Sequence, residues 1–301
     1  MNATATQPTD RYPSRVGESG GMRERTDPVL WGRGNSPAVG PLSGQQLARY
    51  DADGFLVMDG LIDADTVDAC LDDISAKEAG EPPSPDLAIT EPDGGLLRSL
   101  FAVHKGASAL GALVHDERLA GVARQLLGGP VYVHQSRINL KRGMGGKQFP
   151  WHSVFETWHV EDGMPAMRVV SASVALTENR AWNGPLLLIA GSHRWFLSSP
   201  GRTPADNRLT SLKRQTYGVP GADDLTWLTD RGRLDVFEGG PGSVVFFDGN
   251  VMHASPGSSI RVPISMAPVA PMGWPRAMAP PLTLTLAGSA PVSRKNRSTT
   301  E

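Results

Sequence analysis

Two of the seven histidines stand in surroundings that suit a metal site. His152 follows a glycine-rich turn and an aromatic pair in KQFPWHSVFETWHVEDG, and His253 follows an apolar strand and a turn in GSVVFFDGNVMHAS. Neutral imidazole is a common metal ligand, and strand ends of a β-sandwich can bring distant histidines to one metal. The spacing does not require the two to meet, so a pair of hydrogen-bonded histidines without a metal stays open.

A long alternating segment supplies further candidates. VYVHQSRINLK, residues 131–141, has the period of two that is typical of a β-strand. Alternation puts His134, Ser136, Ile138 and Leu140 on one face, and on the other Val133, Gln135, Arg137, Asn139 and Lys141. The second face is unusually polar for a long strand. It either faces solvent or lines a polar pocket.

Short helices followed by strands must position these residues. Asp63 is a suitable N-cap for a helix with one apolar stripe formed by Val67, Cys70, Leu71 and Ile74. In this stripe Cys70 is expected to be a core residue rather than a reactive thiol. A second helix should run from about Asp116 to Gly128, a residue suited to ending it.

The remaining pattern predicts an α+β fold. Further strands are expected over residues 167–176, 186–190 and 243–247, separated by turn-rich loops. Helices first and strands afterwards favour a β-sandwich or barrel with helices outside.

Composition excludes several classes of function. The 301 residues carry 29 Lys and Arg against 31 Asp and Glu, a near-balance that argues against nucleic-acid or membrane-surface binding. A single cysteine excludes an internal disulfide framework and a zinc site built on several thiolates. Neither a secretory signal nor an apolar run of membrane-spanning length is visible, so we expect a cytoplasmic protein.

Three regions differ in composition. Residues 1–43 lack apolar periodicity and predict an irregular arm, and residues 44–258 carry the predicted helices and strands. Residues 259–301 form a Pro/Ala-rich tail with seven prolines between positions 263 and 291. Because proline is rare in central strands, we expect the chain after about residue 259 to pack poorly.

Several phrases resemble one enzyme family. VYVHQSRINLK, WHSVFETWHVEDGMP, NGPLLLIAGSHR and shorter matches such as DRYPSR and RTDPVLWG are similar to the ectoine hydroxylases of the phytanoyl-CoA dioxygenase group. The resemblance implies a double-stranded β-helix (jelly roll) core flanked by helices, and a homodimer. It also implies an Fe(II)- and 2-oxoglutarate-dependent reaction, in which ectoine and O₂ yield 5-hydroxyectoine, succinate and CO₂. The product is a compatible solute made under osmotic stress.

The resemblance also implies roles for individual residues. In this family iron is held by a His-x-Asp pair and a distant histidine. The matching positions are His152 and His253 for the metal, Lys141, Asn139 and Ser171 for 2-oxoglutarate, and Gln135 and Trp158 for ectoine. Three of them have a structural alternative: Lys141 as a solvated surface lysine, Ser171 as a small residue between packed sheets, and Trp158 as a core residue.

Two positions depart from the family pattern. Val154 stands where the family has the iron-binding aspartate, and Ile264 where it has an arginine that pairs with 2-oxoglutarate. Arg261 is three residues away from that position, which on a strand turns it to the other face. An alternative function is therefore a catalytically impaired homologue that binds a small zwitterion or serves a partner protein. A third is an oxygenase with another substrate.

Overall fold

Two antiparallel sheets form the centre of the computed structural model, which describes residues 10–17, 20–33, 36–80, 84, 87–90, 97–140, 148–204, 216–256 and 282–288. The larger sheet has the strand order β4 (Phe55–Met58), β13 (Val244–Asp248), β9 (Val169–Val174), β15 (Leu282–Gly288), β7 (Val131–Asn139), β6 (Leu97–Phe101) and β5 (Ala88–Thr90). The smaller has the order β12 (Arg233–Val236), β10 (Leu187–Ala190), β14 (His253–Ser255) and β8 (Phe149–His152).

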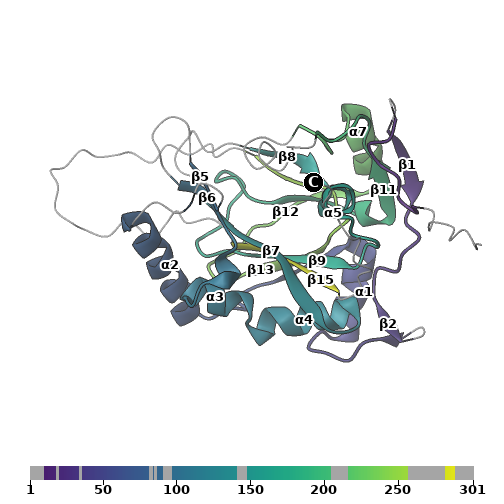
Figure 1. Ribbon diagram of the computed structural model, residues 1–301. Helices are drawn as coiled ribbons and strands as arrows, with labels where there is room; N and C mark the ends of the chain where they lie inside the picture. Colours follow the sequence, from purple (N-terminus) through teal and green to yellow (C-terminus); the bar gives the residue numbers. More distant parts are fainter. Residues whose placement is uncertain are drawn as a thin grey trace, which may run out of the picture.

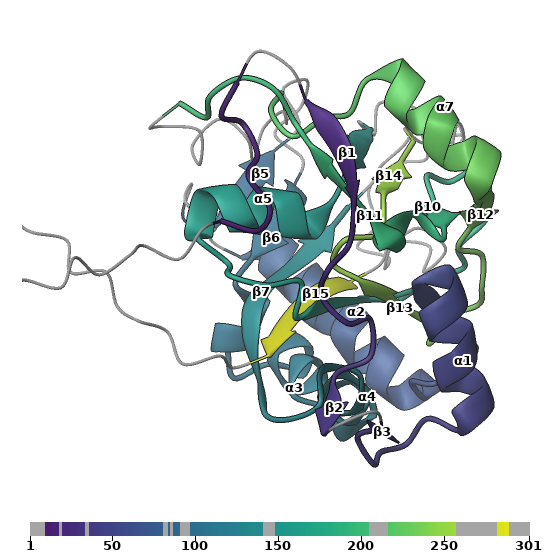
Figure 2. The same ribbon diagram turned by 90° about the vertical axis from the view of Figure 1, so that its right-hand side faces the viewer.

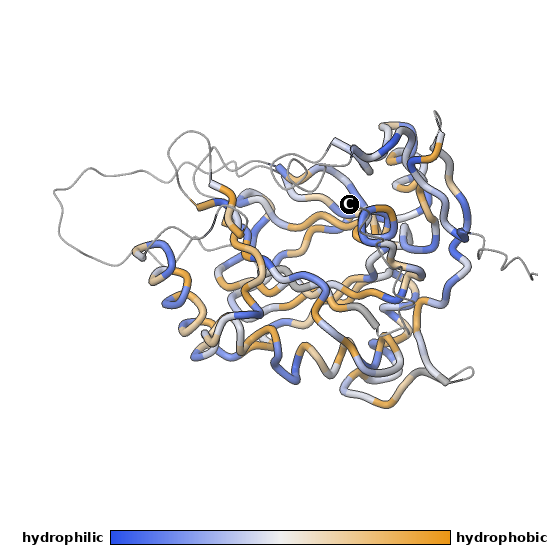
Figure 3. Tube along the Cα trace, in the orientation of Figure 1, coloured by the Kyte–Doolittle hydropathy of each residue, from blue (hydrophilic) through white to orange (hydrophobic). Residues whose placement is uncertain are grey.

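Helices cover the outer face of the larger sheet (Figure 1). They are α1 (Gly44–Asp53), α2 (Ala64–Ala79), α3 (Ala109–Val114) and α4 (Glu117–Leu127). Their apolar stripes pack on the strands in one core cluster, and the central strands are correspondingly apolar in Figure 3. Two further helices, α5 (Val154–Asp162) and α7 (Ala222–Arg231), lie on the side of the smaller sheet (Figure 2). In the described ranges no helix is long and apolar enough to cross a membrane.

The predicted helix boundaries are confirmed. The Asp63 side chain accepts a hydrogen bond from the Thr66 backbone at the start of α2, and the Asp116 side chain does the same for Arg118 at the start of α4. Gly128 ends α4 with φ of 67°, a conformation that glycine adopts without a Cβ penalty. Cys70 is fully buried, and burial raises the pKa of its thiol to about 11. It is therefore a core residue, as expected.

The face of the larger sheet that looks toward the smaller one is partly polar. Ser171 on β9 stands opposite Phe247 on β13 and opposite Thr285 on β15, so these three side chains share a face. Phe247 belongs to an apolar cluster that also contains Leu188 of the smaller sheet, and this cluster joins the two sheets. The inner face therefore combines an apolar contact with a row of hydroxyl and amide groups.

A β-bulge in β7 corrects one detail of the predicted alternation. Thr285 is paired with Gln135, but the next residue of β15, Leu286, is paired with Val133, so one residue of β7 is extra. The extra residue inverts the side-chain alternation beyond Gln135. Val133, predicted on the polar face, consequently packs against the helix-covered core with Ile138.

The prediction of poor packing after residue 259 is wrong for the segment Leu282–Gly288. This segment is strand β15, which lies between β7 and β9 in the larger sheet and pairs with both. Thr285 and Leu286 are 5% and 2% exposed. The prolines nearest to it, at positions 280, 281 and 291, fall outside the strand, so its backbone donors remain available to the ladder.

The amino-terminal region is more closely integrated than an irregular arm would be. Its strand β1 (Gly21–Glu24) pairs with β11 (Trp195–Ser198), and Tyr12 is fully buried against Phe155 and Phe196. Two very short strands, β2 (Gly32–Arg33) and β3 (Ser36–Pro37), pair with each other. The prediction of an irregular arm is therefore wrong for β1, although most of the segment is without regular structure.

Candidate metal centre

The structure brings His152 and His253 together. His152 ends β8, His253 begins β14, and the two residues are direct partners in the antiparallel ladder. Their ring centroids are 4.2 Å apart, and both residues are buried. Residues that are 101 positions apart in sequence thus form one pair of imidazoles, as predicted.

Both rings are held in the tautomer that a metal ligand needs. His152 Nδ1 donates to the Pro150 carbonyl oxygen at 2.8 Å, and His253 Nδ1 donates to the Val251 carbonyl oxygen at 2.9 Å. The lone pair of each imidazole is therefore on Nε2, which no hydrogen bond occupies within the described part of the chain. Burial lowers the pKa of His152 to about 4, and burial together with His152 lowers that of His253 well below its usual value. Both rings are neutral at pH 7 and can donate nitrogen to a metal.

Neither of the two positions after His152 where a third ligand could stand, Val154 and Glu156, completes a three-residue centre. Val154 begins α5 and packs with Phe247 and Val251 in the apolar cluster between the sheets. Glu156 is 2% exposed and accepts from the Arg15 guanidinium at 2.7 Å and 3.0 Å. No group of three His, Cys, Asp or Glu side chains suited to a metal occurs among the described residues. The donor set fits a metal held by two neutral imidazoles, with the other coordination positions open to bound molecules.

The predicted polar positions lie on the same inner face. Asn139 is buried, and its Oδ1 accepts from Ser99 Oγ at 3.1 Å. Ser171 Oγ lies 3.1 Å from Thr285 Oγ1, and Gln135 is the register partner of Thr285 on the other side of β15. Phe247 on β13 stands opposite Ser171, and the centroids of the Phe247 and His253 rings are 4.9 Å apart. The polar residues of this inner face therefore lie beside the histidine pair. Lys141, Arg261 and Ile264 lie outside the described residues.

Trp158 lies next to the bulged end of β7. The centroids of the Trp158 and His134 rings are 4.8 Å apart in an edge-to-face arrangement. His134 Nε2 in turn lies 3.2 Å from Asp162 Oδ2 at the end of α5. The indole Nε1 is buried without a hydrogen-bond partner in the described ranges. A buried indole N–H is usually paired, so this donor suits a polar ligand.

Two arginines are functional candidates that the sequence analysis did not single out. Arg98 and Arg137 each place a guanidinium 5.1 Å from the Phe149 ring at the start of β8. Burial and the charge of Arg98 lower the pKa of Arg137 to about 10, so Arg137 remains cationic at neutral pH. Arg137 occupies the polar side of β7. A charged residue on that face of the alternating segment could have identified it as a candidate from the sequence. The charge of Arg137 acts on both histidines, and together with Arg98 at the same Phe149 ring it can attract an anionic ligand.

The jelly-roll core with paired histidines between its sheets carries two of the three ligands of the 2-His-1-carboxylate centre that is typical of non-haem Fe(II) oxygenases. The chain belongs to the phytanoyl-CoA dioxygenase (PhyH) family, whose sequence profile matches residues 50–261.

Individual relatives are similar over most of their length. A Bordetella bronchiseptica protein named ectoine dioxygenase is 48% identical over 82% of this chain and 80% of its own. A protein of the same name from Sphingopyxis alaskensis is 45% identical, covering 84% and 83%. The crystal structure of EctD from S. alaskensis with 2-oxoglutarate and 5-hydroxyectoine superposes with a TM-score of 0.76 at 37% identity, over 92% of this chain and 86% of that one.

These findings confirm the predicted α+β class with a jelly-roll core flanked by helices. They also confirm the resemblance on which the site residues were assigned. Nothing in them supports the alternative of a catalytically impaired binding protein, since the relatives carry the name of an enzyme.

Proposed function

We propose that this protein is an Fe(II)- and 2-oxoglutarate-dependent hydroxylase of ectoine, which forms 5-hydroxyectoine, succinate and CO₂. The observation that carries the proposal is the pair His152 and His253, whose Nδ1 atoms are anchored to backbone carbonyls while both Nε2 atoms are open. The relatives named ectoine dioxygenase support ectoine as the substrate. Iron bound with 2-oxoglutarate and O₂ would supply the oxidising chemistry.

The chain would hold 2-oxoglutarate on the polar inner face. Asn139 and Ser171 are preset by hydrogen bonds to Ser99 and Thr285, so their remaining donors and acceptors have defined directions. Arg98 and Arg137 supply positive charge for a dicarboxylate, a role that partly replaces the family arginine absent from position 264. We assign Lys141 to the same co-substrate from the resemblance.

Gln135 and Trp158 would contact ectoine, a small zwitterionic ring. Gln135 stands beside Thr285 on the inner face, and Trp158 offers an aromatic surface with an unpaired indole N–H. An aromatic wall attracts the cationic part of such a ligand, and amide groups fix its orientation. Phe247, Val251 and Val154 belong to one buried apolar cluster, and Phe247 lies against the His253 ring, so this side of the histidine pair would exclude water.

The proposal is tested by supplying purified protein with Fe(II), ascorbate, 2-oxoglutarate, O₂ and ectoine. We expect 5-hydroxyectoine and succinate in equal amounts, measured by chromatography. Omitting ectoine should suppress most succinate formation. Failure of ectoine to stimulate succinate formation by a metal-loaded protein would contradict the assignment of the substrate.

Val154→Asp is expected to tighten Fe(II) binding by about tenfold or more, equivalent to ~1.4 kcal/mol. The substitution places an anionic oxygen donor two residues after His152, at the first turn of α5, where the helix dipole favours negative charge. Isothermal titration with Fe(II) under anaerobic conditions measures the dissociation constant. Val154→Asn, which has the same shape without the charge, is the control. An unchanged constant in Val154→Asp would show that position 154 does not face the metal.

We also propose that the enzyme works in the cytoplasm as a homodimer and makes a compatible solute under osmotic stress. The resemblance to ectoine hydroxylases supports this assignment. Sedimentation velocity of the purified protein tests the dimer.

A further inference from the structure

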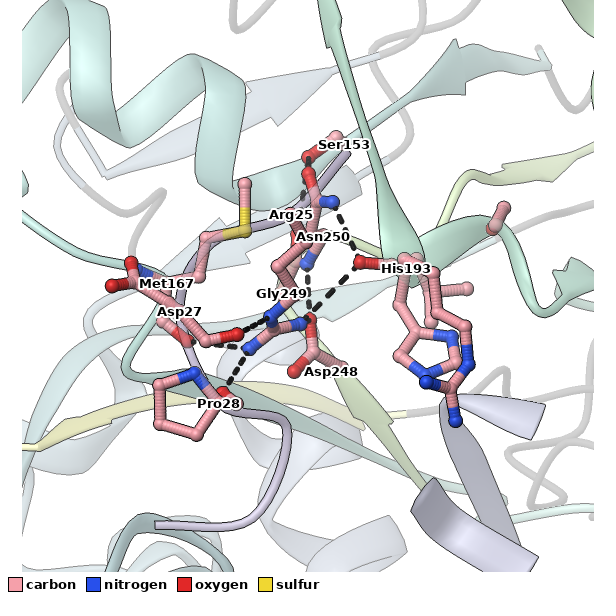
Figure 4. Close-up of polar contacts among 12 residues, drawn as sticks. Arg25, Asp27, Pro28, Ser153, Met167, His193, Asp248, Gly249 and Asn250 are labelled. Atoms are coloured by element: carbon pink, nitrogen blue, oxygen red, sulfur yellow. Dashed lines mark hydrogen bonds and ion pairs between the residues drawn. The ribbon is translucent and has the colours of Figure 1, made fainter. Parts of the chain in front are cut away.

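A buried hydrogen-bond network links the two segments that carry the paired histidines (Figure 4). Ser153, directly after His152, is the N-cap of α5. Its hydroxyl lies 3.2 Å from the Gly249 carbonyl oxygen and 3.2 Å from Asn250 Oδ1. The single hydroxyl proton is shared between these two acceptors. Asn250 belongs to the turn that leads into His253. The two histidine segments are thus joined by side chains as well as by the strand ladder.

The orientation of the Asn250 amide is determined by its other partners. Nδ2 donates to the carbonyl oxygens of His193 at 2.9 Å and Trp195 at 3.0 Å. Because both amide protons are used, Oδ1 must point toward Ser153. Asn250 is 2% exposed, so no hydrogen bond to bulk water replaces these contacts when they are lost.

The backbone of the same turn is held by a buried ion pair. Asp248 Oδ1 accepts from the Asn250 backbone at 2.8 Å and pairs with the Arg25 guanidinium at 2.9 Å. Both charged side chains are 3% exposed. Arg25 also donates to the carbonyl oxygens of Asp27 and Pro28, which ties this turn to the amino-terminal region.

The turn presents the carbonyl group that orients His253. The Val251 backbone donates to the Asp248 carbonyl oxygen at 3.0 Å, and the Val251 carbonyl accepts from His253 Nδ1 at 2.9 Å. A shift of this turn would move the acceptor that sets the tautomer and tilt of the imidazole. Groups that hold the partner of a metal-binding histidine commonly influence metal affinity.

We infer that Asn250 and Ser153 are positioning residues that set the separation and tilt of the two imidazoles for the metal, with Asp248 and Arg25 holding the turn from behind. The inference rests on the proposed function, because it takes His152 and His253 as the metal ligands. The side-chain polar atoms of Asn250 and Ser153 are bonded to each other and to backbone carbonyl oxygens. They act through the histidine segments.

The test titrates the metal-free protein with Co(II) alone and records its visible absorption bands, which report the geometry of the bound ion. Asn250→Ala and Ser153→Gly should each raise the Co(II) dissociation constant by about tenfold or more and alter the bands at saturation. Glycine is accepted at an N-cap, so Ser153→Gly removes the bridge while α5 keeps its start. Ser153→Thr, which retains the hydroxyl, should restore both the affinity and the bands.

Two further variants separate positioning from general stability. Ser43→Gly is the control. It makes the same change at the N-cap of α1, which is far from both histidines in the sequence, and it should leave Co(II) binding unchanged. In the double variant, Ser153→Gly should add less than it does alone, since the Ser153–Asn250 bond is already lost and only the bond to the Gly249 carbonyl oxygen is left to break.

The outcomes distinguish this inference from the proposed function. If wild-type protein binds no Co(II), or if binding does not depend on His253, the assigned metal centre is wrong and both proposals fail. If wild-type binding depends on His253 but Ser153→Gly and Asn250→Ala show unchanged affinity and bands, the positioning role alone is overturned.

Discussion

Replacing either His152 or His253 with alanine is expected to abolish Fe(II) binding and hydroxylation. With His152 and His253 as the two proposed protein ligands, each imidazole would provide half of the donors that the described chain offers to the metal. Loss of an outer partner of a ligand commonly costs 10–100-fold in affinity, so loss of a ligand itself should exceed about 100-fold. Anaerobic Fe(II) titration and the rate of 5-hydroxyectoine formation measure the two effects.

The matched control is His115→Ala, which removes an exposed histidine at the carboxyl end of α3. This variant should retain wild-type Fe(II) affinity and rate. Residual activity of His253→Ala within tenfold of wild type would exclude His253 as a metal ligand. Because both histidines are neutral and buried, circular dichroism must show that each variant keeps its fold before the loss is attributed to the metal.

Replacing Arg15 with alanine is expected to destabilise the protein by about 3–5 kcal/mol, since the change leaves the buried carboxylate of Glu156 without its cation. The two side chains are 1% and 2% exposed and are joined by two hydrogen bonds, and Ser14 donates a third to Glu156 at 2.7 Å. Burial opposes the charge on Arg15, but its bonds to Glu156 hold the arginine pKa above its usual value. Chemical denaturation measures the free energy of unfolding.

An exposed pair provides the comparison. Arg180→Ala removes an ion pair with Glu178 in which both side chains are about half exposed, and should cost less than about 1 kcal/mol. Replacing Arg15 and Glu156 together with methionine should recover much of the loss, because the fully buried carboxylate is then removed together with its cation. Equal destabilisation by Arg15→Ala and Arg180→Ala would show that the Arg15–Glu156 pair contributes nothing beyond an exposed pair.

The Arg15–Glu156 pair also explains why sequence spacing alone is a poor guide to ligands. Glu156 lies four residues after His152 and is the nearest acidic residue on that side in the sequence. Its carboxylate is used by an arginine 141 positions away, a contact that no local pattern encodes. The partner of a buried charge is decided by which segments pack together.

Local patterns were sufficient for much of the fold. The period of two in residues 131–139, the apolar stripe with a capping aspartate in α2, and the Asp116 and Gly128 boundaries of α4 each follow from side-chain spacing within one element. The same reasoning placed Gln135 and Asn139 on the polar side of one strand. These features depend on neighbours in the chain, which is why they can be read without a structure.

The sequence by itself therefore determined several of the helices and strands, the two histidines worth examining and the polar strand beside them, although it missed β1 and β15. Only the tertiary structure decided that His152 and His253 are ladder partners, that a bulge moves Val133 to the other face, and that β15 enters the sheet between β7 and β9. The physical reason is that strand pairing and register are set by contacts between residues far apart in the chain. Periodicity shows which side of a strand is apolar, but not which strand will lie against it.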